Sequence, residues 1–190
     1  DETEYFCPEC GEKVIEDSNY IYFIDIAKKC EYVFTSAEEV VKDYKKDCGH
    51  ENVWVLEFGV NPLFHNPIGF KNVDKIKSIF FAGSWASRYK ERCDDMIEIF
   101  DGVYESDYEL KILDRNYEFD NVNNFFPEKY LKSISPGINH EELQKVHKLF
   151  DWAINLNSIK YSKTMCAMRV YELQAIGNNI LSNYSEAVQS

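Results

Sequence analysis

The sequence of 190 residues contains no apolar run of about 18 residues, the length that a membrane-spanning helix needs, so we expect no membrane span. It also has no excess of basic residues, because 33 Asp and Glu outnumber 21 Lys and Arg and the net charge is −12. Such a surface repels polyanions, which argues against wholesale binding to nucleic acid or to an anionic membrane. A phosphate-bearing ligand would therefore need a local group of basic side chains.

Several familiar motifs are missing as well. Neither GxGxxG nor a Walker motif occurs, so no nucleotide-binding motif of these two types supports another class of nucleotide-dependent enzyme. The first residues, Asp1-Glu-Thr-Glu4, do not have the pattern of a secretory signal peptide. The six cysteines are even in number, but the chain is larger than typical disulfide-stapled secreted domains. We therefore expect reduced thiols and a cytoplasmic protein.

What the sequence does contain is enough apolar material for a packed core, with 45% hydrophobic and 15% aromatic residues. Two hydrophobic periods alternate along its second part. Expected strands that alternate with expected helices predict a Rossmann-like, doubly wound α/β fold with a parallel sheet and flanking helices. The expected strands are 77–82, 108–113, 151–155 and 179–182, and the expected helices are 87–101, 139–149 and 166–176.

We place a domain boundary in a turn-rich stretch that runs from Gly59 to Pro67. Residues 1–66 form the N-terminal segment, with a helix over 18–29, strands near 31–35 and 53–58, and a helix after Ser36. Residues 67–190 form the Rossmann-like domain. His65 falls in the linker, where we expect a surface or hinge histidine rather than a catalytic base.

The first candidate site is the turn Gly83-Ser84, where an apolar strand passes into an expected helix. A helix N-terminus at such a turn offers free backbone N–H groups to an anion. Arg88 and Arg92 follow closely and can add charge-assisted hydrogen bonds to phosphate oxygens. The alternative is an ordinary strand-to-helix turn with two solvated arginines.

The second candidate site follows the strand that ends at Asn155, at the edge where parallel sheets usually bind ligands. Arg169 and Glu172 share a helical face there, and they either contact a ligand or form an intrahelical ion pair. Asp114-Arg115, after another strand, either lines the same crevice or pairs internally. The polar residues of the second site are Asn155, Asn157, Lys160, Ser162, Arg169 and Glu172.

A third group has the spacing of a zinc knuckle. Cys7-Pro-Glu-Cys10-Gly offers two thiolates, and a structural zinc ion requires four ligands. Cys48 and His50 can supply the other pair, although they do not repeat the Cys-x-x-Cys spacing. The pattern indicates a structural zinc site, a zinc-organised adaptor built around Cys7 and Cys10, or a chance spacing.

The chain resembles the CgeB-like (spore maturation) glycosyltransferases over roughly residues 20–190. Upstream, Tyr32-Val-Phe-Thr35, Glu39, Tyr44, Gly49 and His65-Asn-Pro67 resemble the segment that precedes the family's C-terminal domain. That domain is matched by Phe81-Ala-Gly-Ser-Trp85, Tyr89, Glu91, Arg92, Leu113-Asp-Arg115, Phe126-Pro-Glu-Lys-Tyr130, Ile154-Asn-Leu-Asn-Ser158, Ser162, Thr164-Met165, Arg169-Val-Tyr-Glu-Leu173, Gly177 and Ser182.

The resemblance implies the nucleotide-sugar-binding lobe of a two-domain GT-B glycosyltransferase. Glu172 would bind the ribose and Arg169 the pyrophosphate, and transfer to an acceptor hydroxyl would need no metal. The implied donor-binding residues are Gly83, Ser84, Arg88, Asn155, Asn157, Lys160, Ser162, Arg169 and Glu172. The acceptor and the catalytic base stay unassigned, because the family's acceptor-binding lobe is mostly missing from this sequence. The alternative is a non-catalytic protein-interaction module on the same fold.

Overall fold

The computed structural model describes residues 5–6, 13–14, 18–69 and 73–189. The chain divides into two compact units, Asp1–Glu57 and Phe58–Ser190. Residues 58–66, which the sequence analysis places in the N-terminal segment, group with the second unit. The reason lies in His65, which is buried and contacts Glu172 of that unit.

The first unit is a small α/β arrangement. Its strands β3 and β4 pair in parallel, with Val33 opposite Val53, and α2 lies between them in the sequence. The buried core residues are Ile24, Ala27, Val33, Cys48 and Val53. The elements are β1 (Tyr5–Phe6) and β2 (Lys13–Val14), which pair antiparallel, α1 (Ser18–Ala27), β3 (Val33–Thr35), the 3₁₀ turn η1 (Glu38–Val40), α2 (Val41–Cys48) and β4 (Val53–Val55).

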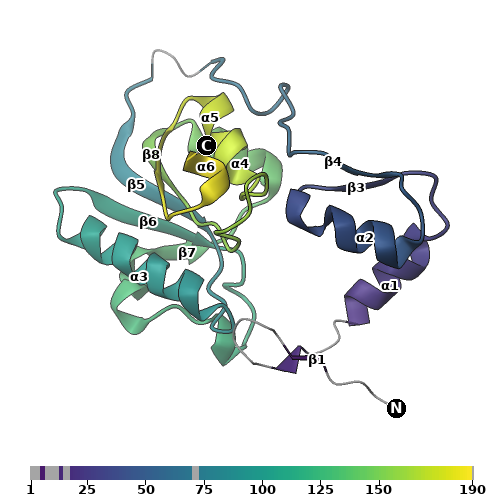
Figure 1. The fold of residues 1–190 in the computed structure, drawn as a ribbon. Coiled ribbons are helices and arrows are strands. Elements are labelled where there is room, and N and C mark those ends of the chain that lie inside the picture. Colours follow the sequence, from purple (N-terminus) through teal and green to yellow (C-terminus); the bar gives the residue numbers. More distant parts are fainter. Residues whose placement is uncertain (1–4, 7–12, 15–17, 70–72, 190) are drawn as a thin grey trace. The chain divides into compact units, whose positions relative to one another are not determined.

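The second unit is built on a five-stranded, entirely parallel sheet with the strand order β7-β6-β5-β8-β9 (Figure 1). This is the Rossmann-like α/β fold that the sequence predicts. In chain order its elements are β5 (Ile76–Gly83), α3 (Lys90–Tyr104), β6 (Glu109–Asp114), η2 (Val122–Asn124), η3 (Glu128–Ser133), β7 (Ile134–Pro136), α4 (His140–His147), β8 (Phe150–Asn155), α5 (Arg169–Ile176), β9 (Asn179–Ser182) and α6 (Glu186–Gln189).

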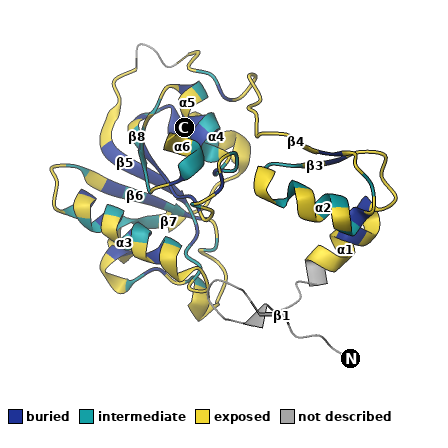
Figure 2. Ribbon diagram, in the orientation of Figure 1, coloured by how far each residue is buried: buried dark blue, intermediate teal, exposed yellow. Residues whose placement is uncertain are grey.

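Both faces of the central strand β5 are covered, which explains its continuous apolar run. Ile79 and Phe81 point into a core cluster with Met96 and Phe100 of α3. The alternate residues Phe80 and Ala82 belong to a second cluster, against which Leu143 and Val146 of α4 pack. Successive side chains of a strand face opposite sides, so α3 and α4 cover opposite faces of the sheet. Figure 2 shows this buried centre in dark blue.

Several element boundaries differ from the predicted ones, and the strand expected over 53–58 is the shorter β4 (Val53–Val55). Helix α3 begins at Lys90 instead of 87, and α5 begins at Arg169 instead of 166. In the first unit, the helix expected after Ser36 is a 3₁₀ turn followed by α2, which begins at Val41. Strand β7 was not predicted, because it has three residues and ends in a proline, which signals no strand of its own. Its partner β6 supplies the pairing that makes it a strand.

None of the helices in the described part of the chain combines the length and the apolar character that crossing a bilayer requires.

The larger core cluster yields a stability prediction. Phe100 is completely buried, and its ring packs against Phe81 and Tyr130 with centroid separations of 5.3 Å and 5.2 Å. Phe100→Ala should lower the free energy of unfolding by about 3–5 kcal/mol in urea denaturation, because it removes a packed ring and leaves a cavity. Phe119→Ala is the control, since this ring is 63% exposed and its loss should cost less than about 0.5 kcal/mol. Equal losses in the two variants would contradict the assignment of the core.

Candidate functional site

The strand order places a topological switch point between β5 and β8. From the first strand β5, the chain moves outward to β6 and β7, then returns to β8 on the other side of β5. Open parallel sheets bind ligands in the crevice at the carboxyl ends of the strands beside such a point. Here those ends are Gly83, which closes β5, and Asn155, which closes β8.

Two of the cavities at this edge have volumes of about 660 Å³ and 190 Å³. Both are lined by Ser84, Arg92 and Arg115, and Arg88 lines the larger and Arg169 the smaller. We call the two cavities together the arginine crevice. The larger is completed by Ala86, Ser87, Tyr89, Asn116, Asn121, Asn123, Asn124, Leu156 and Ser158, and the smaller by Phe81, Ala82, Gly83, Ile154, Asn155, Leu156 and Ala167.

A third cavity, of about 720 Å³, has a different character. It lies between α3 and β9, away from the carboxyl end of β5, and its walls include apolar side chains such as Ile99 and Leu181. Its charged lining residues are Asp95 and Glu98. Two carboxylates repel a phosphate, so the arginine crevice is the candidate site for an anionic ligand.

The arginines are held against the Gly83-Ser84 turn by defined hydrogen bonds. Arg92 donates through Nη1 to the Ser84 carbonyl oxygen at 3.1 Å, and Arg115 donates through Nη2 to Ser84 Oγ at 3.4 Å. Arg169 donates through Nη1 to the carbonyl oxygen of Ala82. Arg88 is exposed and stacks over the Tyr89 ring, 4.7 Å from its centroid. Three guanidinium groups thus converge on one turn.

The electrostatics of these groups favour an anion. Burial lowers the pKa of Arg169; the charge of Glu172 opposes that shift, while Arg115 and Arg92 add to it. Burial also lowers the pKa of Arg92, and nearby Arg115 contributes in the same direction. Like charges that are partly removed from water repel one another. A diphosphate between them would relieve this repulsion through charge-assisted hydrogen bonds.

The Gly83-Ser84 turn differs from the expected helix N-terminus. Helix α3 begins at Lys90, so its first N–H groups do not follow Ser84 directly. Glycine is nonetheless required at position 83, because an added Cβ would lie 2.6 Å from the Phe81 ring. In this arrangement the positive charge at the turn comes from the arginine side chains rather than from a helix dipole.

Arg115 belongs to the crevice. The sequence left open whether Asp114-Arg115 lines a crevice or pairs internally. Asp114 is buried and accepts a hydrogen bond from the Asn116 backbone N–H at 2.9 Å, and burial raises the pKa of its carboxyl. Gly137 lets β7 come close to this strand end, since a Cβ there would lie 3.0 Å from the Asp114 carbonyl oxygen.

The residues predicted after β8 divide into two groups. Asn155 lines the smaller cavity, and its Nδ2 donates to Ser182 Oγ at 3.0 Å. Its buried Oδ1 has no hydrogen-bond partner among the residues that the structure describes. Asn157 is fully buried and shapes the loop, donating to Ser182 and accepting from the Ala167 N–H at 2.9 Å. Ser162 accepts from the Met165 N–H at 2.9 Å in a tight turn. Asn157 and Ser162 do not line the arginine crevice.

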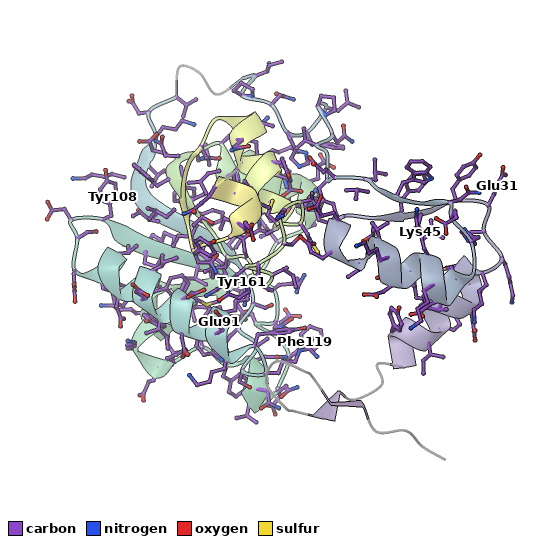
Figure 3. The ribbon with its side chains drawn as sticks, viewed as in Figure 1. Glu31, Lys45, Glu91, Tyr108, Phe119 and Tyr161 are labelled. Carbon is purple, nitrogen blue, oxygen red and sulfur yellow. The ribbon has the colours of Figure 1, made fainter. Side chains whose placement is uncertain are left out.

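Lys160 is also placed away from the crevice. Its Nζ lies 2.9 Å from Glu91 Oε1 and 2.7 Å from Asp95 Oδ2, both on α3. Burial opposes its charge, but the hydrogen bonds to Asp95 and Glu91 outweigh that effect and raise the pKa of Lys160. Glu91 is labelled in Figure 3. This lysine therefore ties the loop after β8 to α3.

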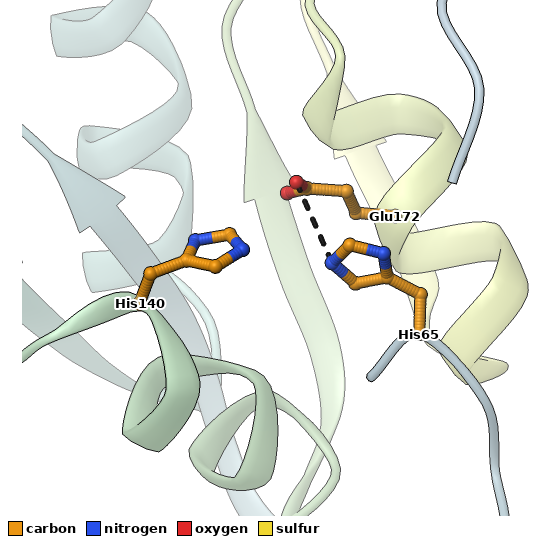
Figure 4. A group of neighbouring side chains, drawn as sticks. All are labelled: His65, His140 and Glu172. Atoms are coloured by element: carbon orange, nitrogen blue, oxygen red, sulfur yellow. Dashed lines mark ion pairs between the residues drawn. The ribbon is translucent and has the colours of Figure 1, made fainter. Parts of the chain in front are cut away.

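Glu172 takes a partner that the sequence did not indicate. Among the described residues its ion-pair partner is His65, with 3.5 Å between Oε1 and Nε2, rather than Arg169. His65 is 7% exposed, so the expectation of a surface histidine is wrong. His140, at the start of α4, faces the same point, as Figure 4 shows. The ligand atoms of all three lie within 4.8 Å of one another, a group able to hold a metal ion.

The predicted zinc ligands lie in the first unit. Cys7 and Cys10 fall outside the described residues. Cys48 is buried with a free thiol, and burial above all raises its pKa. Both ring nitrogens of His50 contact backbone atoms, the Ala27 carbonyl oxygen at 3.4 Å and the Asn52 N–H at 3.2 Å. The zinc site stays a prediction.

Comparison with known proteins supports the fold. No model of a known protein family matches the sequence, and no curated protein matches it. A solved structure that does match is a glycosyltransferase from Rickettsia africae ESF-5, with a TM-score of 0.57 and 18% sequence identity. The alignment covers 92% of this chain and 50% of that one, so this chain spans half of its length. At this identity the likeness establishes a glycosyltransferase-like fold.

A buried histidine near the site gives a pH-dependent prediction. His147 is 1% exposed, and burial, together with the charge of Arg169, lowers its pKa from 6.5 to about 3. Below pH 6.5 the unfolded chain takes up a proton that the folded protein accepts only near pH 3. Stability should therefore fall with falling pH, by about 1.4 kcal/mol per pH unit from this group.

The measurement is urea denaturation between pH 6 and pH 4, with His147→Leu as the comparison. The other titrating groups are shared, so the variant's slope of unfolding free energy against pH should be smaller by that amount. Identical slopes in the two proteins would show that His147 is not a buried neutral group.

Proposed function

We propose that this chain is the donor-binding lobe of a GT-B type glycosyltransferase and holds a nucleotide-diphosphate sugar in the arginine crevice. The proposal rests on one observation above all: Arg92, Arg115 and Arg169 converge on the Gly83-Ser84 turn at the switch point of a chain with net charge −12. The glycosyltransferase-like fold and the resemblance to the CgeB-like family support the same reading.

The chemistry follows from the charges. Glycosyl transfer breaks the bond between the anomeric carbon and the diphosphate, so negative charge grows on the leaving group. Guanidinium groups that are already placed around that group stabilise the charge where it develops. Gly83 and Ser84 then lie against the phosphates, and Arg88 and Asn155 line the surrounding walls.

Within this proposal Glu172 accepts the ribose hydroxyls, as the family resemblance implies. It lies three residues after Arg169 on α5, so a nucleotide can contact both side chains. Asn157, Lys160 and Ser162 support the donor site in this proposal, since they make contacts within and around the loop between β8 and α5. The proposal concerns donor binding, and it names neither the acceptor nor the base that takes the proton of the acceptor hydroxyl.

The first test is calorimetric titration with UDP, GDP, CDP and dTDP. One of them should bind saturably, and Arg115→Ala should weaken that binding about 10- to 100-fold, because a charge-assisted hydrogen bond is lost. Arg115 is the preferred variant since its side chain is exposed and its loss spares the core. Arg169→Ala should have at least as large an effect.

Lys111→Ala is the matched control. This lysine is a cation on β6 that pairs with Glu109 at 2.5 Å and does not line the arginine crevice. Its loss should leave the affinity unchanged within about twofold, since exposed ion pairs contribute little. A folded chain that binds none of the four nucleotides would instead favour the non-catalytic interaction module.

Metal independence makes a separate prediction. Because arginines neutralise the diphosphate, EDTA should leave the nucleotide affinity unchanged within about twofold, with far-UV circular dichroism as the check on folding. A loss of binding that Mg²⁺ or Mn²⁺ restores would contradict metal-independent donor binding.

A further inference from the structure

In the described part of the chain, several buried polar atoms that lack a hydrogen-bond partner lie in the region of Glu172. Three of the chain's four histidines, His65, His140 and His147, are close enough to influence one another's charge. Among the described residues, the buried polar atoms without a partner include His65 Nε2, Gln144 Oε1 and His147 Nδ1, all in this region. Buried polar atoms are normally satisfied, so such a concentration marks a place where a polar ligand or ordered water binds.

His65 is fixed in one orientation by its own loop. The backbone N–H of Asn61 donates to His65 Nδ1 at 3.1 Å. A neutral imidazole that accepts at Nδ1 must carry its proton on Nε2. That nitrogen lies 3.5 Å from Glu172 Oε1, so His65 directs an N–H group at the carboxylate (Figure 4).

The Glu172 carboxylate has little freedom in this setting. Glu172 is 4% exposed, and its Oε1 lies 3.5 Å from His65 Nε2. His140 approaches from α4, with its ring centroid 5.9 Å from that of His65. One carboxylate oxygen of Glu172 thus faces the N–H group of His65.

The neighbouring charges discriminate between two kinds of ligand. Arg169 precedes Glu172 by three residues, and Arg115 and Arg92 lie close enough to Arg169 to affect its charge. A divalent cation at Glu172 would face this positive group at close range, which costs energy in a partly buried site. An uncharged diol donates hydrogen bonds to the carboxylate without that penalty.

We propose that His65 is a positioning residue for the donor: it holds the Glu172 carboxylate in the orientation that accepts the ribose hydroxyls and so selects ribonucleotides over 2′-deoxyribonucleotides. This inference rests on the proposed donor function. It adds a role for the segment before β5, since Asn61 and His65 lie upstream of the sheet.

The test compares each of UDP, GDP, CDP and ADP with its 2′-deoxy counterpart by calorimetry on the full chain. The ribonucleotide that binds best should bind about tenfold or more tightly than its deoxy form, because a hydrogen bond to a charged group is lost. In His65→Ala this preference should fall towards one, while the affinity for the deoxynucleotide changes less than about threefold.

Two further variants separate positioning from a general structural effect. His65→Gln keeps an N–H donor at the end of the side chain and should retain most of the ribose preference. His50→Ala, in the first unit, should leave the preference unchanged. Circular dichroism of each variant checks that it folds.

The outcomes distinguish this inference from the donor proposal. If nucleotide binds and His65→Ala keeps the ribose preference, the role of His65 is overturned, while the proposed donor site is still supported. Absence of binding by every nucleotide overturns both. Zn²⁺ that binds to the wild-type chain and is lost in both His140→Ala and His65→Ala would identify a metal site in place of the ribose site.

Discussion

The second unit, Phe58–Ser190, has to hold several positive charges close together at the carboxyl edge of its sheet, and the other features of this unit depend on that requirement. Three guanidinium groups are brought together in a chain whose net charge is −12, and burial and mutual repulsion lower the pKa of two of them. Backbone and hydroxyl oxygens of the β5 end hold them in place. The glycine at position 83 and the close approach of Gly137 to β6 keep this edge compact.

A second set of polar residues builds the support for that edge and stays out of the crevice. Asn157 links the end of β8 to the start of α5 and to Ser182 of β9, and Lys160 joins the same loop to α3 through Glu91 and Asp95. These contacts fix where α5 begins. Because Arg169 is its first residue and Glu172 follows three residues later, the position of both depends on this buried network.

The strands and their pairing type were predictable because the β5 run, covered on both faces, is continuously apolar, and the helices between strands show the longer period. Helix starts were less predictable. The segments 87–89 and 166–168 have suitable composition, yet tertiary contacts occupy them: Ser87 N–H donates to the Asn123 carbonyl oxygen, and Ala167 N–H to Asn157. Arg115 and Arg169 were recognised as candidates, whereas His140 had no local signal, since one histidine at a helix start follows no pattern.

The sequence by itself determined the alternation of strands and helices, the acidic surface, and the residue types at the strand ends, because hydrophobic period and charge are local properties. Only the tertiary structure decided which polar residues line the arginine crevice and which make contacts within the scaffold. Arg115 meets Arg169 and Arg92 because the order β6-β5-β8 brings separate strand ends together. His65 meets Glu172 because the segment before β5 packs onto α5. Such contacts depend on the spatial order of elements that are far apart in the chain. The spacing of residues along the sequence does not encode that order.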